Sequence, residues 1–190
     1  MHLIQPYERW LTYYDSSQDD RCPFYGKEYN MDVYSETIYG YYIDPAWDSF
    51  GSPTLYLKIL FADYEEGYIV LEFIGEWNDA IENDIMTLKR NFIELMIEEG
   101  IDKFILIGEN ILNFHGSDDS YYEEWYEETE KGWIAGIGFP EHVREEMNKS
   151  GILNYLKMDE SIQIGNWRTF QPERFCESLN SIIVRGRIQG

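Results

Sequence analysis

After residue 54, continuous apolar runs alternate with segments in which apolar residues recur at helical spacing. The runs "TLYLKILFA" and "GYIVLEFIG" are separated by "DYEEG", a connection of hairpin length that ends in a glycine. Two more runs, "DKFILIGE" and "GWIAGIGF", are typical of buried strands. "ILNYLKM" and "SIQIGNW" predict two further strands nearer the end of the chain.

Four segments carry helical patterns. In "WNDAIENDIMTLKRNFIELMIEEG" the apolar residues follow a 4-3-4-3 spacing, with Asn78 or Asp79 as the N-cap and Gly100 as the stop. The apolar face predicted for this long helix is Ile81, Ile85, Leu88, Phe92 and Leu95. Further helices are predicted in "SDDSYYEEWYEETEKG", "PEHVREEMNKSG" and "QPERFCESLNSIIV". In the last of them, the residues expected to face inward are Phe175, Leu179, Ile182 and Ile183.

This alternation predicts an α/β fold with a mixed sheet flanked by helices, because the first two strands form a hairpin. A length of 190 residues suits a single domain over 1–190. Residues 1–50 hold nine of the 16 tyrosines and predict an irregular N-terminal layer, in which "VYSETIYGYYID" contains a short strand. Residues 51–190 form the α/β body.

The element order from residue 67 onward resembles the STAS-like fold of anti-sigma-factor antagonists. The strands "GYIVLEFIGEW", "DKFILIGE" and "GWIAGIGF", with the helices between and after them, carry the resemblance over roughly residues 67–185. In that family a serine at the start of the helix after the second of these strands is phosphorylated to control partner binding. The resemblance therefore implies Ser117 or Ser120 as a modification site, although "FHGSDDSYYEE" is more acidic than the family's motif.

The charge is strongly acidic, with 36 Asp and Glu against 15 Lys and Arg and a net charge of −21. Such a field repels nucleic acid and anionic membrane surfaces, and it attracts cations and basic proteins. The same excess of charge would also serve solubility alone. A basic protein is the partner that we expect, with no nucleic acid and no membrane.

Cysteine usage and the absence of targeting signals predict a cytoplasmic protein. Cys22 and Cys176 lie far apart and form no CxxC motif, as a reducing compartment permits. The start "MHLIQPYERW" lacks the pattern of a signal peptide. No apolar run approaches the roughly 20 residues that a membrane-spanning helix needs.

The segment 117–132 predicts an amphipathic helix that begins with a capping box of Ser120 and Glu123. Its apolar stripe is Tyr121, Tyr122, Trp125, Tyr126 and Thr129. Its opposite side is Glu123, Glu124, Glu127, Glu128 and Glu130. With the rings against the sheet, the carboxylates form a rigid surface for a basic partner. The predicted partner-binding residues are Asp118, Asp119, Glu123, Glu124, Glu127 and Glu128.

Candidate chemistry elsewhere is sparse. His115, Asp118 and Asp119 are candidate metal ligands, but no HExxH motif or calcium-loop spacing accompanies them, so no metal or cofactor is expected. No catalytic residue is assigned.

Two other polar stretches have structural interpretations. In "GEWNDAIEND", Glu76, Asp79, Glu82 and Asp84 would do acid–base work only if they were buried, and Asp79 as a cap with Glu82 in water is favoured. Arg168 is expected to stack on Trp167 or Phe170 or to bind a carboxylate of this chain.

The function predicted from these features is a non-enzymatic, acidic protein-binding or regulatory module that engages a basic partner. One alternative is an immunity-type or nucleic-acid-mimic protein that neutralises a basic nuclease. The other is a metal-dependent hydrolase built on His115 and the nearby acids.

Overall fold

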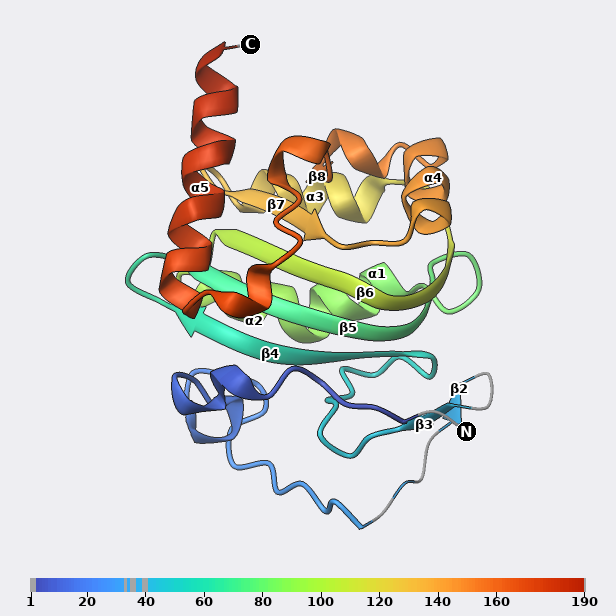
Figure 1. Ribbon diagram of the computed structural model, residues 1–190. Helices are drawn as coiled ribbons and strands as arrows, with labels where there is room; N and C mark the ends of the chain where they lie inside the picture. The colour runs from blue at the N-terminus through green and yellow to red at the C-terminus, as the bar shows by residue number, and fades with distance from the viewer. Residues whose placement is uncertain (1–2, 33, 35–36, 39–40, 190) are drawn as a thin grey trace.

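The centre of the molecule is a five-stranded sheet with helices on both faces (Figure 1). The computed structural model describes residues 3–32, 34, 37–38 and 41–189. The strand order is β4-β5-β6-β7-β8, in which β4 is antiparallel to β5 and the other pairs are parallel. The predicted α/β fold with a mixed sheet is confirmed. The strands are β4 (Leu55–Asp63), β5 (Tyr68–Asn78), β6 (Lys103–His115), β7 (Trp133–Ile137) and β8 (Leu156–Lys157).

Two layers of helices pack on opposite faces of this sheet. Side chains along β5 alternate between the two faces. Leu71 and Phe73 lie in the core with α1 to α4, whereas Val70 lies in the core with α5. In Figure 1, α5 (red) crosses the near face, and α1 and α2 (green) lie behind the sheet. The helices are α1 (Asp84–Leu88), α2 (Glu94–Glu98), α3 (Ser120–Glu128), α4 (Glu141–Lys149) and α5 (Pro172–Gln189). Shorter helical turns are η1 (Arg9–Thr12), η2 (Ser16–Gln18), the π-helix η3 (Lys89–Ile93), η4 (Ile152–Asn154), η5 (Glu160–Ile162) and η6 (Trp167–Thr169).

The N-terminal layer follows the β4 edge of the sheet (Figure 1, blue). It contains a small sheet of order β1-β3-β2 and is otherwise mostly turns. Its strands are β1 (Leu3–Ile4), β2 (Thr37–Ile38) and β3 (Tyr41–Ile43). The predicted strand in "VYSETIYGYYID" falls on β2 and β3, but residues 33, 35–36 and 39–40 of it lie outside the described residues. The indole N–H of Trp47 donates to the carbonyl of Ile4 (2.8 Å), and Asp48 pairs with Leu57 of β4.

The long helix begins later than the sequence predicts, and part of its predicted apolar face is exposed. β5 keeps pairing with β6 as far as Asn78, so the chain stays extended there and the helical segment begins only at Asp84. A π-helical stretch then follows α1. A π turn holds one residue more than an α turn and rotates the following side chains about the helix axis. Ile93 and Met96 are therefore buried against the sheet. Two of the predicted inward residues are exposed, Ile81 (81%) and Leu95 (42%).

The end of the chain differs from the prediction in one element. "ILNYLKM" does contain a strand, the two-residue β8, but "SIQIGNW" forms η5, a loop and the start of η6 instead of a strand. Its side chains take the place of backbone pairing: the Gln163 amide donates to the carbonyl of Gly136 and accepts from the N–H of Gly138, both at 3.0 Å. The closing helix is confirmed, with Phe175, Leu179 and Ile183 buried and Ile182 half-buried.

Candidate functional site

The acidic helix α3 lies in the crossover between β6 and β7 and is fixed by its rings. Tyr122 and Trp125 are fully buried, and the Trp125 ring meets Phe104 of β6 edge to face at 5.1 Å. Tyr121 is half-buried and Tyr126 is 38% exposed. The rings thus pack toward the sheet as predicted, although the buried stripe is narrower.

The predicted capping box is wrong. Ser120 is the first helical residue and Asp119 occupies the N-cap position without a side-chain cap. The Ser120 hydroxyl donates to the Asp118 carboxylate, which also accepts the Ser120 backbone N–H at 3.1 Å. These bonds hold the pKa of Asp118 below its usual value. An Asx-type turn therefore forms the start of the helix, because the Asp118 carboxylate accepts the Ser120 N–H that Glu123 would accept in a capping box.

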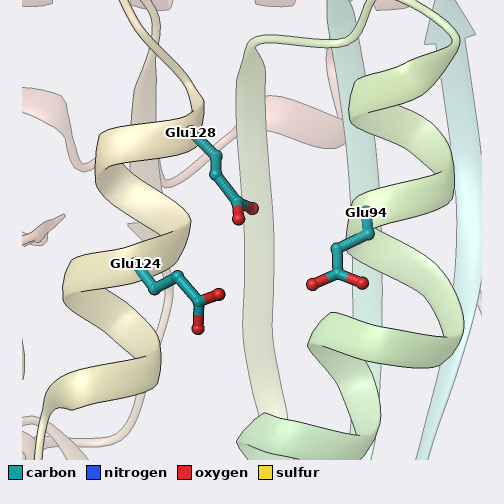
Figure 2. A group of neighbouring side chains, drawn as sticks. All are labelled: Glu94, Glu124 and Glu128. Carbon is teal, nitrogen blue, oxygen red and sulfur yellow. The ribbon is translucent and has the colours of Figure 1, made fainter.

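The four glutamates of α3 divide into two pairs with different surroundings. Glu123 and Glu127 are exposed, whereas Glu124 and Glu128 are half-buried and face the α1–η3–α2 segment. Figure 2 shows Glu124 and Glu128 extending from α3 toward Glu94, which points back from the opposite helix. One side of the predicted acidic surface is thus used inside the molecule.

A buried lysine holds these three carboxylates together. Lys89 has no exposed surface, and its Nζ lies 2.9 Å from Glu94, 2.9 Å from Glu128 and 3.2 Å from Glu124. Arg90 adds contacts to Glu94 and Glu124. Burial alone would lower the pKa of Lys89, but its hydrogen bonds to the carboxylates outweigh burial and raise that pKa. Glu94 responds in the opposite sense, since the Lys89 hydrogen bond lowers its pKa.

The same cluster is the group in the described part of the chain whose spacing suits a metal ion. The ligand oxygens of Glu94, Glu124 and Glu128 lie within 4.8 Å of one another. The Lys89 ammonium lies among them and supplies the positive charge that a bound cation would supply. The cluster is therefore a structural ion-pair network between two helices.

The other predicted site residues lie around the start of α3. Ser117, Asp118 and Ser120 are exposed, and Asp119 is half-buried. Desolvation raises the pKa of Tyr155, and the neighbouring carboxylates of Asp119 and Glu123 raise it further, which places both acids beside this ring.

His115 and the two aspartates are not brought together as metal ligands among the described residues. His115 lies at the end of β6, and its Nε2 is 3.1 Å from Oε1 of Glu76 and 3.1 Å from the Asn113 amide.

Buried carboxylates at the end of β5 were underestimated from the sequence. Asp79 is 4% exposed and Asp84 is fully buried, whereas Glu82 is exposed as expected. Asp79 is not the N-cap, a position that Asn83 occupies, but its Oδ1 accepts the N–H of Ile85 in the first turn of α1 at 2.9 Å, and its Oδ2 accepts the Tyr122 hydroxyl at 2.7 Å. Burial raises the pKa of Asp79 to about 6, against the effect of these hydrogen bonds. Through these two hydrogen bonds Asp79 connects α1 and α3 to the end of the sheet.

A second polar site, on the face that carries α5, was not predicted as a site. Glu72 lies inside the apolar run of β5 and is 1% exposed. Arg168 fulfils both alternatives considered for it, since its guanidinium lies 4.5 Å from the centre of the Trp167 ring and 2.6 Å from the Glu109 carboxylate. The one sequence signal for this site is a lone acidic residue within an otherwise apolar strand.

Comparison with known proteins gives a likeness in structure alone. No family model matches the chain, and no curated protein matches its sequence. The chain is similar to the solved structure of the anti-sigma factor antagonist SpoIIAA in its unphosphorylated form, with 13% identity over 60% of this chain and 97% of that chain and a TM-score of 0.42. It is also similar to the Bacillus cell fate determinant SpoIIAA in the phosphorylated form, with 12% identity over 54% of this chain and 90% of that chain and a TM-score of 0.37. The predicted resemblance to the STAS-like fold is found again here, as a resemblance of element order.

In the part of the chain that the structure describes, no helix combines the length and the apolar character that crossing a membrane requires.

Proposed function

We propose that this chain is a non-enzymatic binding protein that engages a basic protein partner through the outer side of α3. The observation that carries the proposal is the division of the α3 glutamates. Glu124 and Glu128 form ion pairs with Lys89 and brace the helix, while Glu123 and Glu127 are exposed one turn apart. The proposed contact surface is thus Glu123 and Glu127, extended by Asp118 and Asp119 at the start of the helix.

The rigidity of α3 supports this role. Tyr122 and Trp125 anchor the helix to the sheet, and the Lys89 network anchors it to the neighbouring helix. Carboxylates on a fixed helix lose little conformational freedom on binding, so more of the interaction energy remains for affinity. A net charge of −21 adds long-range attraction, which speeds association with a basic partner.

The proposal includes the cytoplasmic location and the modification sites expected from the sequence. Cys22 and Cys176 are both unpaired and buried, as suits a reducing compartment. Ser117 and Ser120 are exposed and therefore within reach of a modifying enzyme. A phosphate on either serine would stand beside Asp118, whose negative charge opposes the added charge. The phosphate would nevertheless strengthen the attraction for a basic partner.

The test is a binding experiment with two variants of equal charge. The chain is immobilised and exposed to native extract at about 50 mM and at about 500 mM salt, concentrations between which the screening of surface charges becomes strong. The test variant is Glu123→Gln with Glu127→Gln. The control is Glu173→Gln with Glu177→Gln, which removes two exposed carboxylates at the same spacing on α5, on the opposite face of the sheet.

We expect a defined basic partner to be retained at low salt by the wild-type chain and by the α5 control. The same partner should be lost at high salt and with the α3 variant. Retention of every bound protein by the α3 variant would show that this side of the helix is a solvated surface and would refute the proposal.

A further inference from the structure

Glu72 stands in the middle of β5 on the face opposite α3, and only one of its carboxylate oxygens is well satisfied. Oε2 accepts the backbone N–H of Tyr7 at 2.7 Å. The donors nearest to Oε1 are farther away, the Asn110 amide at 3.4 Å and Arg168 Nη2 at 3.8 Å. Buried carboxylates usually accept several short hydrogen bonds, because burial without them is costly. Oε1 therefore retains the capacity to accept a stronger donor.

A bulge in β6 gathers the other polar groups beside Glu72. Glu72 is in register with Ile107 and Ile74 with Asn110, so β6 holds an extra residue between these two pairs. Side chains of consecutive residues in a regular strand point to opposite faces. Here Asn110 reaches Glu72, and Glu109 accepts the Trp167 indole N–H at 2.9 Å on the same face. Bulges of this kind often redirect side chains next to binding sites.

Of these residues, Glu72 and Asn110 line an open groove of about 440 Å³. Pro6 and Tyr7 of the N-terminal segment and Arg168 of η6 also line the groove. The Arg168 side chain is 40% exposed, so its guanidinium is accessible from the groove, although Nη2 also contacts Glu109. The volume is within the range of sites for small molecules.

The lining of the groove carries both signs of charge. Glu8 and Glu72 supply carboxylates, and Arg9 and Arg168 supply two of the 15 basic side chains of the chain. A simple anion would meet Glu72 and Glu8, and a simple cation would meet the guanidinium of Arg168. A ligand with one charge of each sign pairs with both kinds of group.

We propose that this groove binds a small zwitterion, whose ammonium group contacts Glu72 and whose carboxylate contacts Arg168, the pattern of a free α-amino acid. The ammonium supplies the close donor that Oε1 of Glu72 lacks. The planar guanidinium of Arg168 matches the two oxygens of a carboxylate. The site is separate from α3 and does not rest on the function proposed for that helix.

The test is isothermal titration calorimetry of the wild-type chain with the common α-amino acids, together with thermal-shift assays. For each amino acid that binds, the N-acetyl derivative and the carboxamide serve as matched probes that lack one charge each. We expect each derivative to bind at least about tenfold more weakly than the free amino acid, which corresponds to about 1.4 kcal/mol. Since these probes act on the wild-type chain, the result does not depend on the folding of a variant.

A second arm uses Glu72→Gln, which keeps an acceptor for the Tyr7 N–H but removes the charge. It should weaken binding by about tenfold or more, whereas Glu173→Gln on α5 should leave binding unchanged. The proposal is overturned if no amino acid at about 10 mM produces heat or a shift in Tm, since a ligand at concentrations well above Kd must stabilise the folded state. It is equally overturned if the blocked derivatives bind as well as the free amino acid, or if a folded Glu72→Gln protein binds like the wild type.

Discussion

Nζ of Lys89 lies 2.9 Å from Oε1 of Glu128 and thereby joins the π-helical turn η3 to the last turn of α3. The two residues are 39 positions apart in the sequence. Lys89 is completely buried, while the Glu128 side chain keeps 35% of its surface exposed. Desolvation therefore penalises the ammonium more than the carboxylate, and the charged form of Lys89 depends on the carboxylates around it.

We expect the double substitution Glu124→Gln and Glu128→Gln to lower the free energy of unfolding by about 3 kcal/mol. Of the three carboxylates in the network, the buried ammonium then keeps Glu94 alone. Adding Lys89→Met to this variant should recover most of the loss, since a buried methionine needs no counter-ion. Urea unfolding at neutral pH measures all three free energies.

The matched control for this cycle is Glu123→Gln with Glu127→Gln, on the exposed side of the same helix. It should change the free energy of unfolding by no more than about 0.5 kcal/mol. Equal effects of the inner and the outer pair would mean that Lys89 does not depend on Glu124 and Glu128.

The Lys89 network also shows why sequence patterns predicted the elements better than the site. The apolar spacing identified the helix, and the rings of Tyr122 and Trp125 identified the buried side of α3. The spacing did not indicate the π turn, which rotates Ile93 and Met96 inward in place of Leu95. Nor does a lysine in a helical pattern indicate which acids will meet it, since two of its three partners, Glu124 and Glu128, come from another helix far along the chain.

Glu72 illustrates the same limit for the sheet. A single glutamate within "GYIVLEFIG" fits a strand with one polar position, and β5 forms as predicted. Whether that position is solvated or buried depends on the N-terminal segment, whose Tyr7 N–H contacts Oε2, and on Arg168 of η6, which lies near Oε1. Local patterns predict the strand, while tertiary contacts determine the chemistry of the side chain.

Gly75 is a position where the fold has no room for a side chain. Its φ is +119°, and a Cβ there would come within 2.0 Å of the carbonyl oxygen of Thr54, the residue just before β4. We expect Gly75→Ala to lower the free energy of unfolding by more than about 4 kcal/mol, because backbone strain and a backbone clash act together.

Gly26 and Gly165 separate these two causes. Gly26 also has a positive φ, +71°, but a Cβ would meet no atom within 4 Å, so Gly26→Ala should cost about 1 kcal/mol through strain alone. Gly165 has open space and no positive φ, and Gly165→Ala should be neutral or slightly stabilising. A cost for Gly75→Ala no greater than for Gly26→Ala, in the same urea unfolding series, would contradict the close approach of β4 and β5 at this residue.

The buried carboxylate of Glu72 should make stability depend on pH. Burial raises the pKa of Glu72 from 4.5 to about 7, while the Tyr7 N–H and Arg168 counteract part of the rise. The folded state then holds this proton at pH values where the unfolded state has released it. Stability contributed by Glu72 is therefore complete below about pH 4.5 and falls as pH rises toward 7.

We expect Glu72→Gln to gain on the wild type by about 3 kcal/mol between pH 4.5 and 7.5, because glutamine has no proton to lose. Urea unfolding of both proteins across this range gives the difference, in which all other titrating groups cancel. Glu173→Gln should run parallel to the wild type. A difference that stays constant with pH would show that Glu72 titrates alike in the folded and unfolded states.

The hydrogen bond from Tyr122 to Asp79 offers a last test, because both partners are buried and the bond connects α3 to the end of β5. The Tyr122 hydroxyl donates to Oδ2 of Asp79 at 2.7 Å. We expect Tyr122→Phe to lower the free energy of unfolding by about 1–3 kcal/mol at pH 8. At this pH Asp79 is ionised, and the substitution removes a hydrogen-bond donor from its charged carboxylate. Tyr126→Phe, which removes the hydroxyl of a partly exposed ring of the same helix, should have little effect.

The effect of Tyr122→Phe should shrink as pH falls, and the sign follows from the pKa of Asp79. Burial raises this pKa to about 6, and the Tyr122 hydrogen bond holds it from rising further. Without the hydroxyl the folded-state pKa moves higher, so the variant loses additional stability between pH 6 and 8 that the wild type keeps. At pH 5 the carboxyl group is mostly protonated in both folded proteins and the penalty falls to that of a neutral hydrogen bond, about 1 kcal/mol. A penalty that is the same at pH 5 and pH 8 would mean that the Tyr122 hydroxyl does not stabilise the charge of Asp79.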